Sequence, residues 1–357
     1  MSYTHYYENP RRFPVAGILF QPPLELDPEW RMAGVRFPPK LAAGMVFLSV
    51  GDGLIRAYDE STAQLAWEFR LPESKSDVMR ADILIADEAL LTVQNDEAFV
   101  LDLFSGKLLY RVTAGYPHLG PAVFDRNSLF CLTHDADLNA YCARLDLETG
   151  SFAWKRPVDN SPGYLTKAGE CILLPRGDSQ LLCLSAGAGT PLWSADTSGI
   201  TGPVLAYENL AIAAMHPGAL AAFELSSGEM RWTQNTEIET AFRVCGYGNS
   251  LIVLGRDFCW RISAGTGRVE HRTNIERAFK RIGIVLPTAA TATEDCLFFS
   301  AVHEKLILAL DLDSGDVVWS HRTEDRIPVY NAPVIGKRMY VVDAAGVLYA
   351  FRQSAAR

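Results

Sequence analysis

Short runs of apolar residues alternate with polar, glycine-containing segments along nearly the whole chain, and one combination recurs in register. In it, an apolar strand-like run is followed by a small polar residue and then a glycine, and an aromatic residue stands four positions after the glycine. The clearest copies are LDLETGSFAW, FELSSGEMRW and LDLDSGDVVW. With the weaker copies included, the pattern ends at Trp67, Tyr110, Trp154, Trp193, Trp232, His271 and Trp319.

The spacing of these anchors indicates the fold. They stand 43, 44, 39, 39, 39 and 48 residues apart, and a period near 40 that is built from strands is typical of propeller blades. Two further apolar runs precede the turn in each repeat, and a run marked by Gly or Pro, such as Gly120–Val123, comes before them. Each repeat therefore predicts four strands, which is the composition of one blade.

The turn residues of the repeat follow from backbone sterics. The glycine of each copy, for example Gly106, stands where a hairpin turn requires a positive φ. The Ser or Thr before it can hydrogen-bond back into the turn, and the aromatic residue is placed to pack between neighbouring blades. Ala63 replaces glycine in the first copy, so we expect a looser turn or a turn of another type there.

The two ends of the chain set the number of blades. Gly346–Phe351 is a third strand that lacks its turn and outer strand, and Trp30 is a candidate for the missing outer-strand aromatic, supplied by the N-terminus. The sequence therefore predicts an all-β fold: an eight-bladed β-propeller of four-stranded antiparallel blades, closed by an N-terminal strand that joins the C-terminal blade. We expect residues 1–23 to form an N-terminal extension and residues 24–357 to form the propeller as a single domain.

The recurring motif resembles the pyrroloquinoline-quinone (PQQ) type of propeller repeat, whose blades carry the tryptophan-docking signature A-x-D-x-x-T-G-x-x-x-W. The resemblance covers roughly residues 24–357. Family members include quinoprotein dehydrogenases and a bacterial lipoprotein that serves as a scaffold in outer-membrane assembly, so the resemblance implies a fold and leaves the function open. Such dehydrogenases often hold a disulfide between adjacent cysteines, and this chain has no adjacent cysteines and no obvious cofactor-enclosing insertion. We therefore expect no cofactor, PQQ included.

Composition and charge narrow the classes of partner that the chain is expected to bind. A formal net charge of −9 argues against nucleic-acid binding, which requires a basic footprint, and against docking on an anionic membrane. No apolar run near the start has the length of a signal-peptide core or a membrane span. The seven cysteines form no CxxC pair, and most lie in apolar runs. We therefore predict a reduced, cytoplasmic location.

Histidines gather in the connectors at one end of the predicted blades, opposite the Thr-Gly turns. Function often collects on loops held by a rigid scaffold, and histidines with carboxylates at the mouth of the central channel could bind a metal of unspecified identity or carry out acid–base catalysis. In the alternative interpretation, these connectors are simply solvated and the histidines lie far apart. The candidate catalytic residues are His118, His134, His216 and His303.

A second set of polar residues is a candidate for binding a ligand or partner. The longest interval between anchors contains a basic cluster, which in an acidic protein could receive an acidic partner or an anionic ligand. If this insert is helical, Glu276, Arg277 and Lys280 share one face; otherwise the cluster belongs to a solvated loop. The candidate binding residues are Arg256, Asp257, Arg277, Lys280, Arg281, Glu304, Tyr330 and Asn331.

Two kinds of function remain open at this point. The first is a binding or scaffolding propeller that presents one face and the channel mouth to a protein partner. The alternative is a cofactor-independent enzyme or small-ligand binder that uses the histidines and carboxylates at the channel mouth. A buried histidine cluster with perturbed pKa values would favour the alternative, whereas an exposed apolar patch would favour a protein partner.

Overall fold

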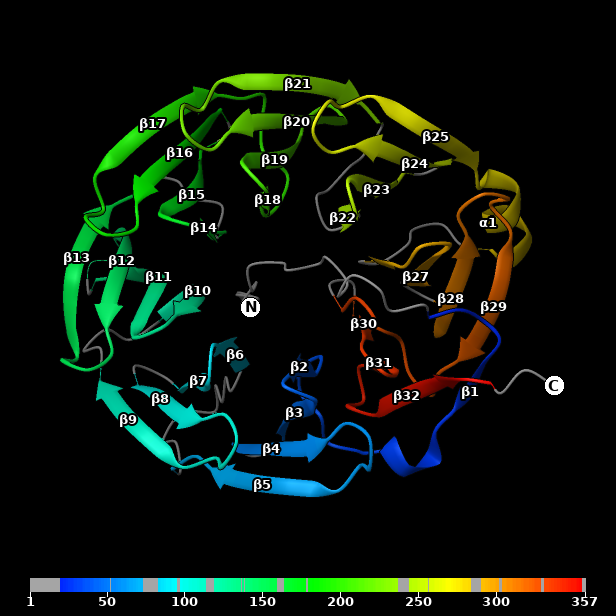
Figure 1. The fold of residues 1–357 in the computed structure, drawn as a ribbon, viewed down its shortest axis with the longest axis horizontal. Helices are drawn as coiled ribbons and strands as arrows, with labels where there is room; N and C mark the ends of the chain where they lie inside the picture. The colour runs from blue at the N-terminus through cyan, green and yellow to red at the C-terminus, as the bar shows by residue number, and fades with distance from the viewer. Residues whose placement is uncertain are drawn as a thin grey trace. The chain divides into compact units, whose positions relative to one another are not determined.

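The computed structural model describes residues 20–51, 53–72, 83–94, 97–113, 119–135, 137, 139–158, 164–177, 179–236, 244–255, 257–283, 290–301, 304–328 and 331–354. Over these residues the chain forms eight four-stranded sheets and one α-helix (Figure 1). The strand pairs are antiparallel, as in β10 to β13. The predicted fold class, an all-β eight-bladed β-propeller of four-stranded antiparallel blades, is confirmed.

The chain divides into two compact units, which we describe separately. One consists chiefly of Ala66–Thr233, and the other of Gln234–Arg357 with Arg56–Leu65 and the described residues up to Gly51. The sheet of β2 (Lys40–Ala42), β3 (Met45–Val50), β4 (Leu54–Asp59) and β5 (Leu65–Arg70) contains residues of each unit.

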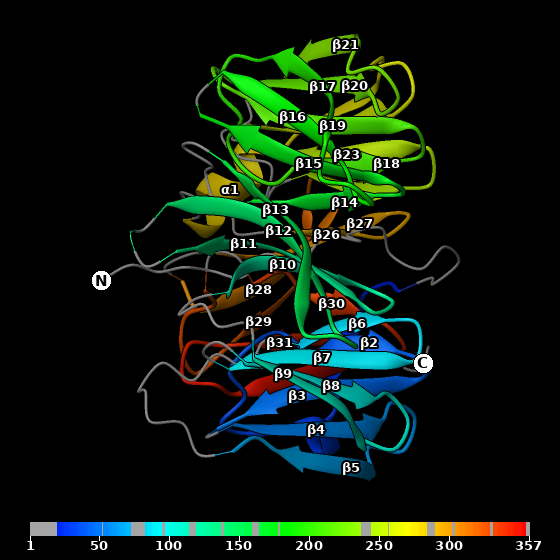
Figure 2. The ribbon, with the colours of Figure 1, turned by 90° about the vertical axis from the view of Figure 1, so that its left-hand side faces the viewer.

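Four sheets belong to the first unit, and in each the strands pair in chain order. Figure 2 shows this order for β14 to β17. The strands are β6 (Ile83–Ala86), β7 (Ala89–Gln94), β8 (Glu97–Asp102) and β9 (Leu108–Thr113); β10 (Leu119–Asp125), β11 (Ser128–His134), β12 (Ala140–Asp146) and β13 (Ser151–Pro157); β14 (Thr166–Ala168), β15 (Cys171–Arg176), β16 (Gln180–Ser185) and β17 (Pro191–Asp196); and β18 (Leu205–Tyr207), β19 (Leu210–Met215), β20 (Ala219–Glu224) and β21 (Met230–Asn235).

The second unit holds three further sheets and the helix. Their elements are β22 (Val244–Tyr247), β23 (Ser250–Leu254), β24 (Phe258–Ser263) and β25 (Val269–Asn274); α1 (Glu276–Ile282); β26 (Thr291–Ala292), β27 (Cys296–Ala301), β28 (Leu306–Asp311) and β29 (Val317–Arg322); and β30 (Val334–Ile335), β31 (Met339–Val342), β32 (Leu348–Gln353) and β1 (Leu24–Leu26), with the 3-10 helix η1 (Pro28–Trp30) after β1. Among the described residues, no helix has the length and apolar character needed to cross a membrane.

Hydrophobic clusters form between neighbouring sheets. In the first unit, one cluster joins residues of β6 to β8 with residues of β10 to β12, including Leu91 and Leu129, both fully buried. The middle strands are therefore apolar on both faces, as the pattern MVFLSV of β3 illustrates. Outer strands such as β13 and β29 alternate between exposed and partly covered residues, because successive side chains point to opposite faces of the sheet and one face is more solvated than the other.

Closure by an N-terminal strand is confirmed. β1 pairs with β32 in the register Leu24 to Gln353 and Leu26 to Phe351, and the sheet has the order β1-β32-β31-β30. The first strand in the sequence thus forms the outer strand of the last blade.

Trp30 is not on that outer strand, and this part of the prediction is wrong. It lies in η1, is fully buried, and packs edge-on against Tyr58 and Tyr340, with ring centroids 5.9 and 5.3 Å apart. The strand ends early because the Asp27 carboxylate accepts a hydrogen bond from the backbone N–H of Glu29 and turns the chain into η1.

The expectation of a different turn at Ala63 is also wrong. Ala63 takes a positive φ of 57°, and its N–H donates to the carbonyl of Asp59, as the N–H of Gly106 does to Asp102. The Asp59 carboxylate accepts hydrogen bonds from the N–H and hydroxyl of Thr62. These side-chain bonds hold the turn despite the strain of a left-handed alanine.

Candidate functional site

In three copies of the repeat within the first unit, a tryptophan seals the junction with the next sheet. The indole N–H of Trp67 donates to the carbonyl of Leu103 at 3.0 Å. A Cβ built on Gly106 would lie 2.5 Å from the Trp67 ring, so only glycine leaves room for the indole. The same pair of contacts joins Trp154 to Ala186 and Gly189, and Trp193 to Leu225 and Gly228.

Each of five outer strands also carries a β-bulge just before its aromatic anchor. In β9, Leu101 pairs with Leu108 and Val100 pairs with Tyr110, so Leu109 is the extra residue. The same register shift occurs in β13, β17, β25 and β29. The extra residues are exposed: Leu109, Ala153, Leu192, Glu270 and Val318.

The junction after β9 departs from the sealed arrangement. Tyr110 stands in the tryptophan position and is 36% exposed. A Cβ on Gly150, the glycine of the next turn, would meet only Val112, at 3.4 Å. Val112 therefore occupies the place beside this glycine, and the Tyr110 ring is left partly in solvent.

Apolar side chains concentrate on the outside of this blade. Eight large hydrophobic side chains are exposed among the described residues, and four of them lie between positions 104 and 110. The other four are single residues on four different strands. We call the group the apolar edge; its members are Phe104 (53% exposed), Leu108 (38%), Leu109 (45%) and Tyr110 (36%).

The strand that carries the apolar edge is held firmly. The Arg111 guanidinium donates two hydrogen bonds to the Glu97 carboxylate on β8, both at 3.0 Å, and lies 5.4 Å from the centroid of the Phe99 ring. The bonds to Glu97 raise the pKa of Arg111 above its usual value. Thr113 also pairs with Glu97 in the ladder. These contacts hold the backbone of β9 against β8.

The sequence contains a feature, separate from its histidines and charged residues, that indicates the apolar edge. At the position of Phe104, two residues before the turn glycine, the other copies carry small or polar residues: Ser61, Glu148, Gly187, Ser226, Gly265 and Asp313. Among the seven copies, this one departs from the pattern at two positions, because it has a phenylalanine at the solvated turn position and Tyr110 in place of tryptophan.

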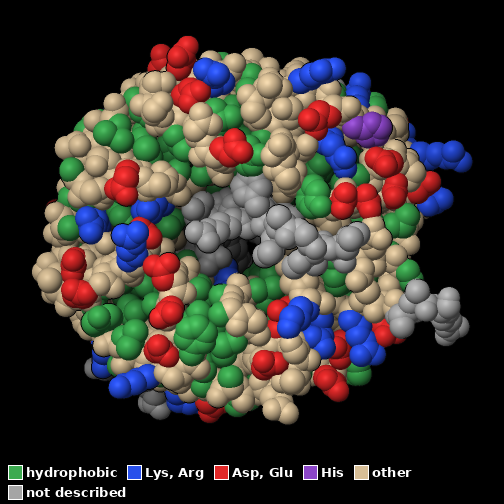
Figure 3. Space-filling model, in the orientation of Figure 1, with side chains coloured by type: hydrophobic (Ala, Val, Ile, Leu, Met, Phe, Trp, Pro, Cys, Tyr) green, Lys and Arg blue, Asp and Glu red, His purple; other side chains and the backbone are tan. Residues whose placement is uncertain are grey.

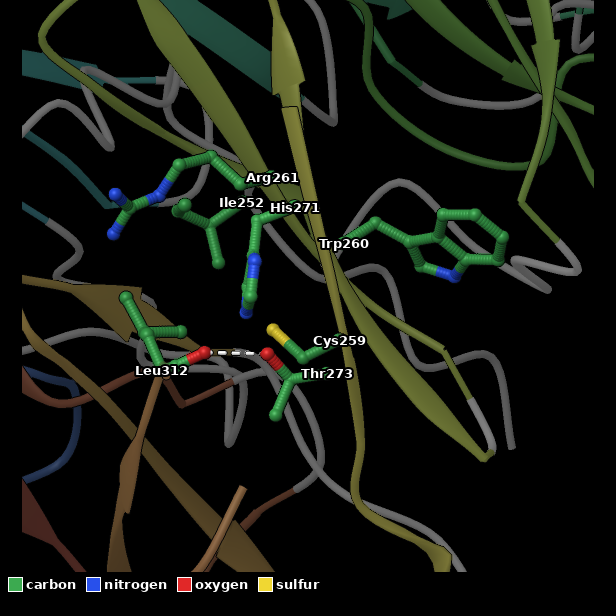
Figure 4. A pocket seen from close by; sticks show the side chains of 7 residues that line it. All are labelled: Ile252, Cys259, Trp260, Arg261, His271, Thr273 and Leu312. Carbon is green, nitrogen blue, oxygen red and sulfur yellow. Dashed lines mark hydrogen bonds between the residues drawn. The ribbon is translucent and has the colours of Figure 1, made fainter. Parts of the chain in front are cut away.

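A second departure occurs at His271 of β25, where a small pocket opens (Figure 4). The hydroxyl of Thr273 donates to the carbonyl of Leu312 at 2.5 Å, replacing the indole contact of the regular copies. About 10 Å³ is open to the centre of a water molecule, which is room for one water and far less than a small-molecule ligand occupies. The lining residues are Ile252, Cys259, Trp260, Arg261, His271, Thr273 and Leu312.

The chemistry available in this pocket is limited. Burial raises the pKa of the Cys259 thiol far above neutrality, so it stays protonated and is a poor nucleophile. Helix α1 supplies much of the packing that tryptophan gives elsewhere. Ile275, Ala278 and Phe279 are buried, and the Phe279 ring lies 5.6 Å from Phe299 of β27.

The structure does not test the predicted histidine cluster. His118 and His303 lie outside the described residues, and the side chain of His134, on β11, is not described either. His216 is exposed; its N–H donates to Gly199 and its carbonyl accepts from the Ser198 hydroxyl. Over the described part of the chain, no group of three or more His, Cys, Asp or Glu side chains is placed to hold a metal. The catalytic role of these histidines stays a prediction.

Two connector carboxylates accept hydrogen bonds from residues of their own loops. Asp135 accepts hydrogen bonds from the backbone and side chain of Asn139, which lower its pKa to about 2. Asp343, nearly buried, accepts from the N–H groups of Ala345 and Val347 and from the Tyr349 hydroxyl. Both carboxylates therefore serve to shape a connector.

The predicted binding residues are only partly described. Arg256 and Tyr330 lie outside the described residues. The carbonyl of Asp257 accepts from the N–H of Ile275, the carbonyl of Glu304 accepts from Arg322, and the amide of Asn331 donates to the carbonyl of Val342. The remaining three, Arg277, Lys280 and Arg281, are exposed on α1, which confirms that this insert is helical.

Eight four-stranded sheets, with an indole-to-turn contact repeated at three junctions, define this protein as a PQQ-type β-propeller. The family described as outer membrane protein assembly factor BamB matches residues 51–170 and 145–234, more than half of the chain. The chain belongs to this family.

Comparisons with individual proteins agree with the assignment to this family. BamB of Yersinia pestis, an outer membrane protein assembly factor, is 23% identical over 213 residues, which cover 56% of this chain and half the length of that relative. The crystal structure of BamB from Moraxella catarrhalis has a TM-score of 0.67 at 14% identity, covering 92% of this chain and 99% of the other. Quinohemoprotein alcohol dehydrogenase from Comamonas testosteroni also scores 0.67, at 12% identity, covering 97% and 79%. At such identities the structural likeness shows the fold alone.

The predicted cytoplasmic location is wrong. The matched family and the Yersinia relative are named for the outer membrane, which points to the outer membrane and periplasm. The prediction relied on cysteines, and all seven are free, six of them buried. A buried thiol packs as a small hydrophobe in an oxidising or a reducing compartment, so these cysteines carry no information about location.

Proposed function

We propose that this chain is a protein-binding scaffold in the assembly of outer-membrane proteins, and that its apolar edge binds an extended segment of such a protein. The concentration of exposed apolar side chains at Phe104, in the turn before β9, and at Leu108, Leu109 and Tyr110, on β9, carries the proposal. Membership of a family named for outer-membrane protein assembly supports the kind of partner.

The chemistry of the partner matches this surface. Proteins of the outer membrane are β-barrels whose strands alternate apolar and polar residues. Before such a strand is paired, its apolar side chains are exposed to water, and contact with a fixed apolar surface removes part of that exposure. The backbone edge of β9 from Tyr110 to Thr113 can also hydrogen-bond to an extended segment, because no strand of the described part of the chain pairs with it on that side.

Rigidity of the edge favours binding. The ion pair between Arg111 and Glu97 and the ladder with β8 fix β9 before a partner arrives, so little conformational entropy is lost on association. Aromatic side chains such as those of Tyr110 and Phe104 offer a large contact area. They have few rotatable bonds, so little conformational entropy is lost when they bind.

The proposal is tested with an outer-membrane β-barrel protein unfolded in urea and diluted into buffer that contains this protein. We expect the wild-type chain to reduce light scattering from aggregation of the unfolded barrel, and to bind it in a fluorescence titration. The double variant Phe104→Ser/Leu109→Ser should weaken binding by about tenfold or more, because two apolar side chains that would be buried at the contact are lost.

Leu192→Ser is the matched control. Leu192 is also the bulged residue of an outer strand and is 53% exposed, but it stands without apolar neighbours of this kind. The proposal requires this variant to bind as the wild type does. Equal loss in both variants, or none in the double variant with its fold intact by circular dichroism, would contradict the assignment of the apolar edge.

A further inference from the structure

Helix α1 turns one side to the core and the other to solvent. It has seven residues, too few for a helix to be stable alone in water. Burial of Ile275, Ala278 and Phe279 holds it in place, and Gly283 ends it with a φ of 81° and an N–H that donates to the carbonyl of Phe279. The solvent-facing side chains therefore stand on a fixed support.

Two arginines on that solvent side have no charged or hydrogen-bonding partner among the described residues. Arg277 and Arg281 are exposed, and neither forms an ion pair or hydrogen bond with any other residue that the structure describes. Lys280, between them in sequence, is already paired with Glu276. Residues four apart on a helix are neighbours, about 5–6 Å apart at Cβ, so the two guanidinium groups repel one another. Within the described part of the chain, neither arginine stabilises the fold through an ion pair or hydrogen bond.

The local charge differs in sign from that of the whole chain. Residues 268–281 contain five basic residues and two acidic ones, whereas the chain carries a net charge of −9. Figure 3 shows Lys and Arg side chains projecting at the margin where Figure 1 draws β25 and α1, with Asp and Glu close by. Basic residues therefore outnumber acidic ones over this short stretch of the chain.

We infer that Arg277 and Arg281 form a docking site for an acidic segment of a partner protein. Guanidinium groups bind carboxylates through paired hydrogen bonds, and two of them one helical turn apart fit two carboxylates at a similar spacing. A planar anionic membrane fits less well, because the same approach would bring Glu270, Glu276 and the net negative chain against it. This inference does not rest on the apolar edge.

The test uses a fluorescein-labelled alanine-based peptide with two glutamates four residues apart, and the same peptide with glutamines in their place. We expect the wild-type chain to bind the glutamate peptide, with an affinity that falls as salt rises. The double variant Arg277→Ala/Arg281→Ala should bind at least about tenfold more weakly, since it loses hydrogen bonds to charged groups. Arg277→Lys/Arg281→Lys should bind with intermediate affinity, because it keeps the charge and loses the paired geometry.

Arg70→Ala is the matched control, since Arg70 is an exposed arginine at the end of another outer strand. The thermal midpoint of the double alanine variant should not fall, because the substitution removes a like-charge pair from a helix whose buried side is untouched. Binding of the glutamine peptide equal to that of the glutamate peptide would overturn the inference. So would equal losses in the control and the double variant.

A third arm separates a protein partner from a lipid surface. Vesicles of phosphatidylcholine with phosphatidylglycerol should neither bind the wild-type chain nor compete with the glutamate peptide. Binding of the vesicles that depends on Arg277 and Arg281, without binding of the peptide, would show a membrane site and overturn the inference. The double alanine variant should bind the unfolded outer-membrane protein as the wild type does, so the two proposals fail independently.

Discussion

The sheet β6 to β9 contacts its neighbours in two different ways. On the side of its turn, the Trp67 ring covers Gly106 and donates to the carbonyl of Leu103. On the side of its outer strand, Tyr110 leaves Gly150 to Val112 and stays 36% exposed. The same position of the repeat thus holds a buried ring that seals one junction and a partly exposed ring at the other.

The largest expected difference comes from removing the two rings. Trp67→Ala should lower the free energy of unfolding by about 3–5 kcal/mol, because it leaves a cavity over Gly106 and an unpaired carbonyl at Leu103. Tyr110→Ala should lower it by less than about 1 kcal/mol, because the ring is partly solvated. Urea denaturation followed by circular dichroism measures both values. Similar losses would show that the Tyr110 junction is sealed as firmly as the other.

The two turn glycines allow a closer comparison. Gly106 and Gly150 both have a φ of 68°, so alanine at either position pays the same conformational cost, about 1–2 kcal/mol. Gly106→Ala should lose about 1–3 kcal/mol more, because its Cβ would lie 2.5 Å from the Trp67 ring. The measurement is the difference in unfolding free energy between the two variants. Equal destabilisation would mean that the indole moves aside without cost.

Tyr110→Trp should convert the open junction toward a sealed one. An indole that displaces Val112 from beside Gly150 would donate a hydrogen bond to the neighbouring turn, worth about 1 kcal/mol of stability. Burial of the ring should at the same time weaken binding of the unfolded outer-membrane protein. A rise in the thermal midpoint with unchanged binding would separate Tyr110 from the binding surface.

The smallest expected effect is a response to pH at the Trp319 junction. His321 stacks near Trp319 and packs against Phe351, with ring centroids 4.9 Å apart for the latter pair. Burial lowers the pKa of His321 below its ordinary value of 6.5. The folded chain therefore resists protonation, and stability falls as the pH drops through 6.5 and below. The thermal midpoint of wild type should fall between pH 7 and pH 5, and that of His321→Gln should fall less.

The fold could be predicted from the sequence because its signals are local. Asp102 and Ser105 hydrogen-bond within a single turn, and Gly106 supplies the positive φ, so each repeat specifies its own hairpin. Ala63 was misjudged because the bonds of the Asp59 carboxylate, which hold that turn, act whether or not glycine follows. Trp30 was misplaced because spacing along the chain does not show where a strand ends.

The candidate site was harder to predict from the sequence than the fold. The exposure of Tyr110 depends on Val112 filling the place beside Gly150, and that place belongs to another sheet. Which described residues lie within reach of Arg277 and Arg281 likewise depends on how α1 packs against the rest of the fold. The sequence did contain the exceptions, since Tyr110 and His271 stand where most copies have tryptophan. Comparison of each repeat with the others therefore finds such sites better than the chemistry of single residues.

The bulges before the outer aromatics have a consequence for solubility. A propeller of this kind displays a free backbone edge on every outer strand, and such edges template fibre-like polymerisation when they are long and flat. In β9 the bulge at Leu109 leaves the stretch from Tyr110 to Thr113 in regular register. Two molecules that met edge to edge could pair their backbones over this short segment only. The apolar strand can therefore remain exposed without joining one propeller to the next.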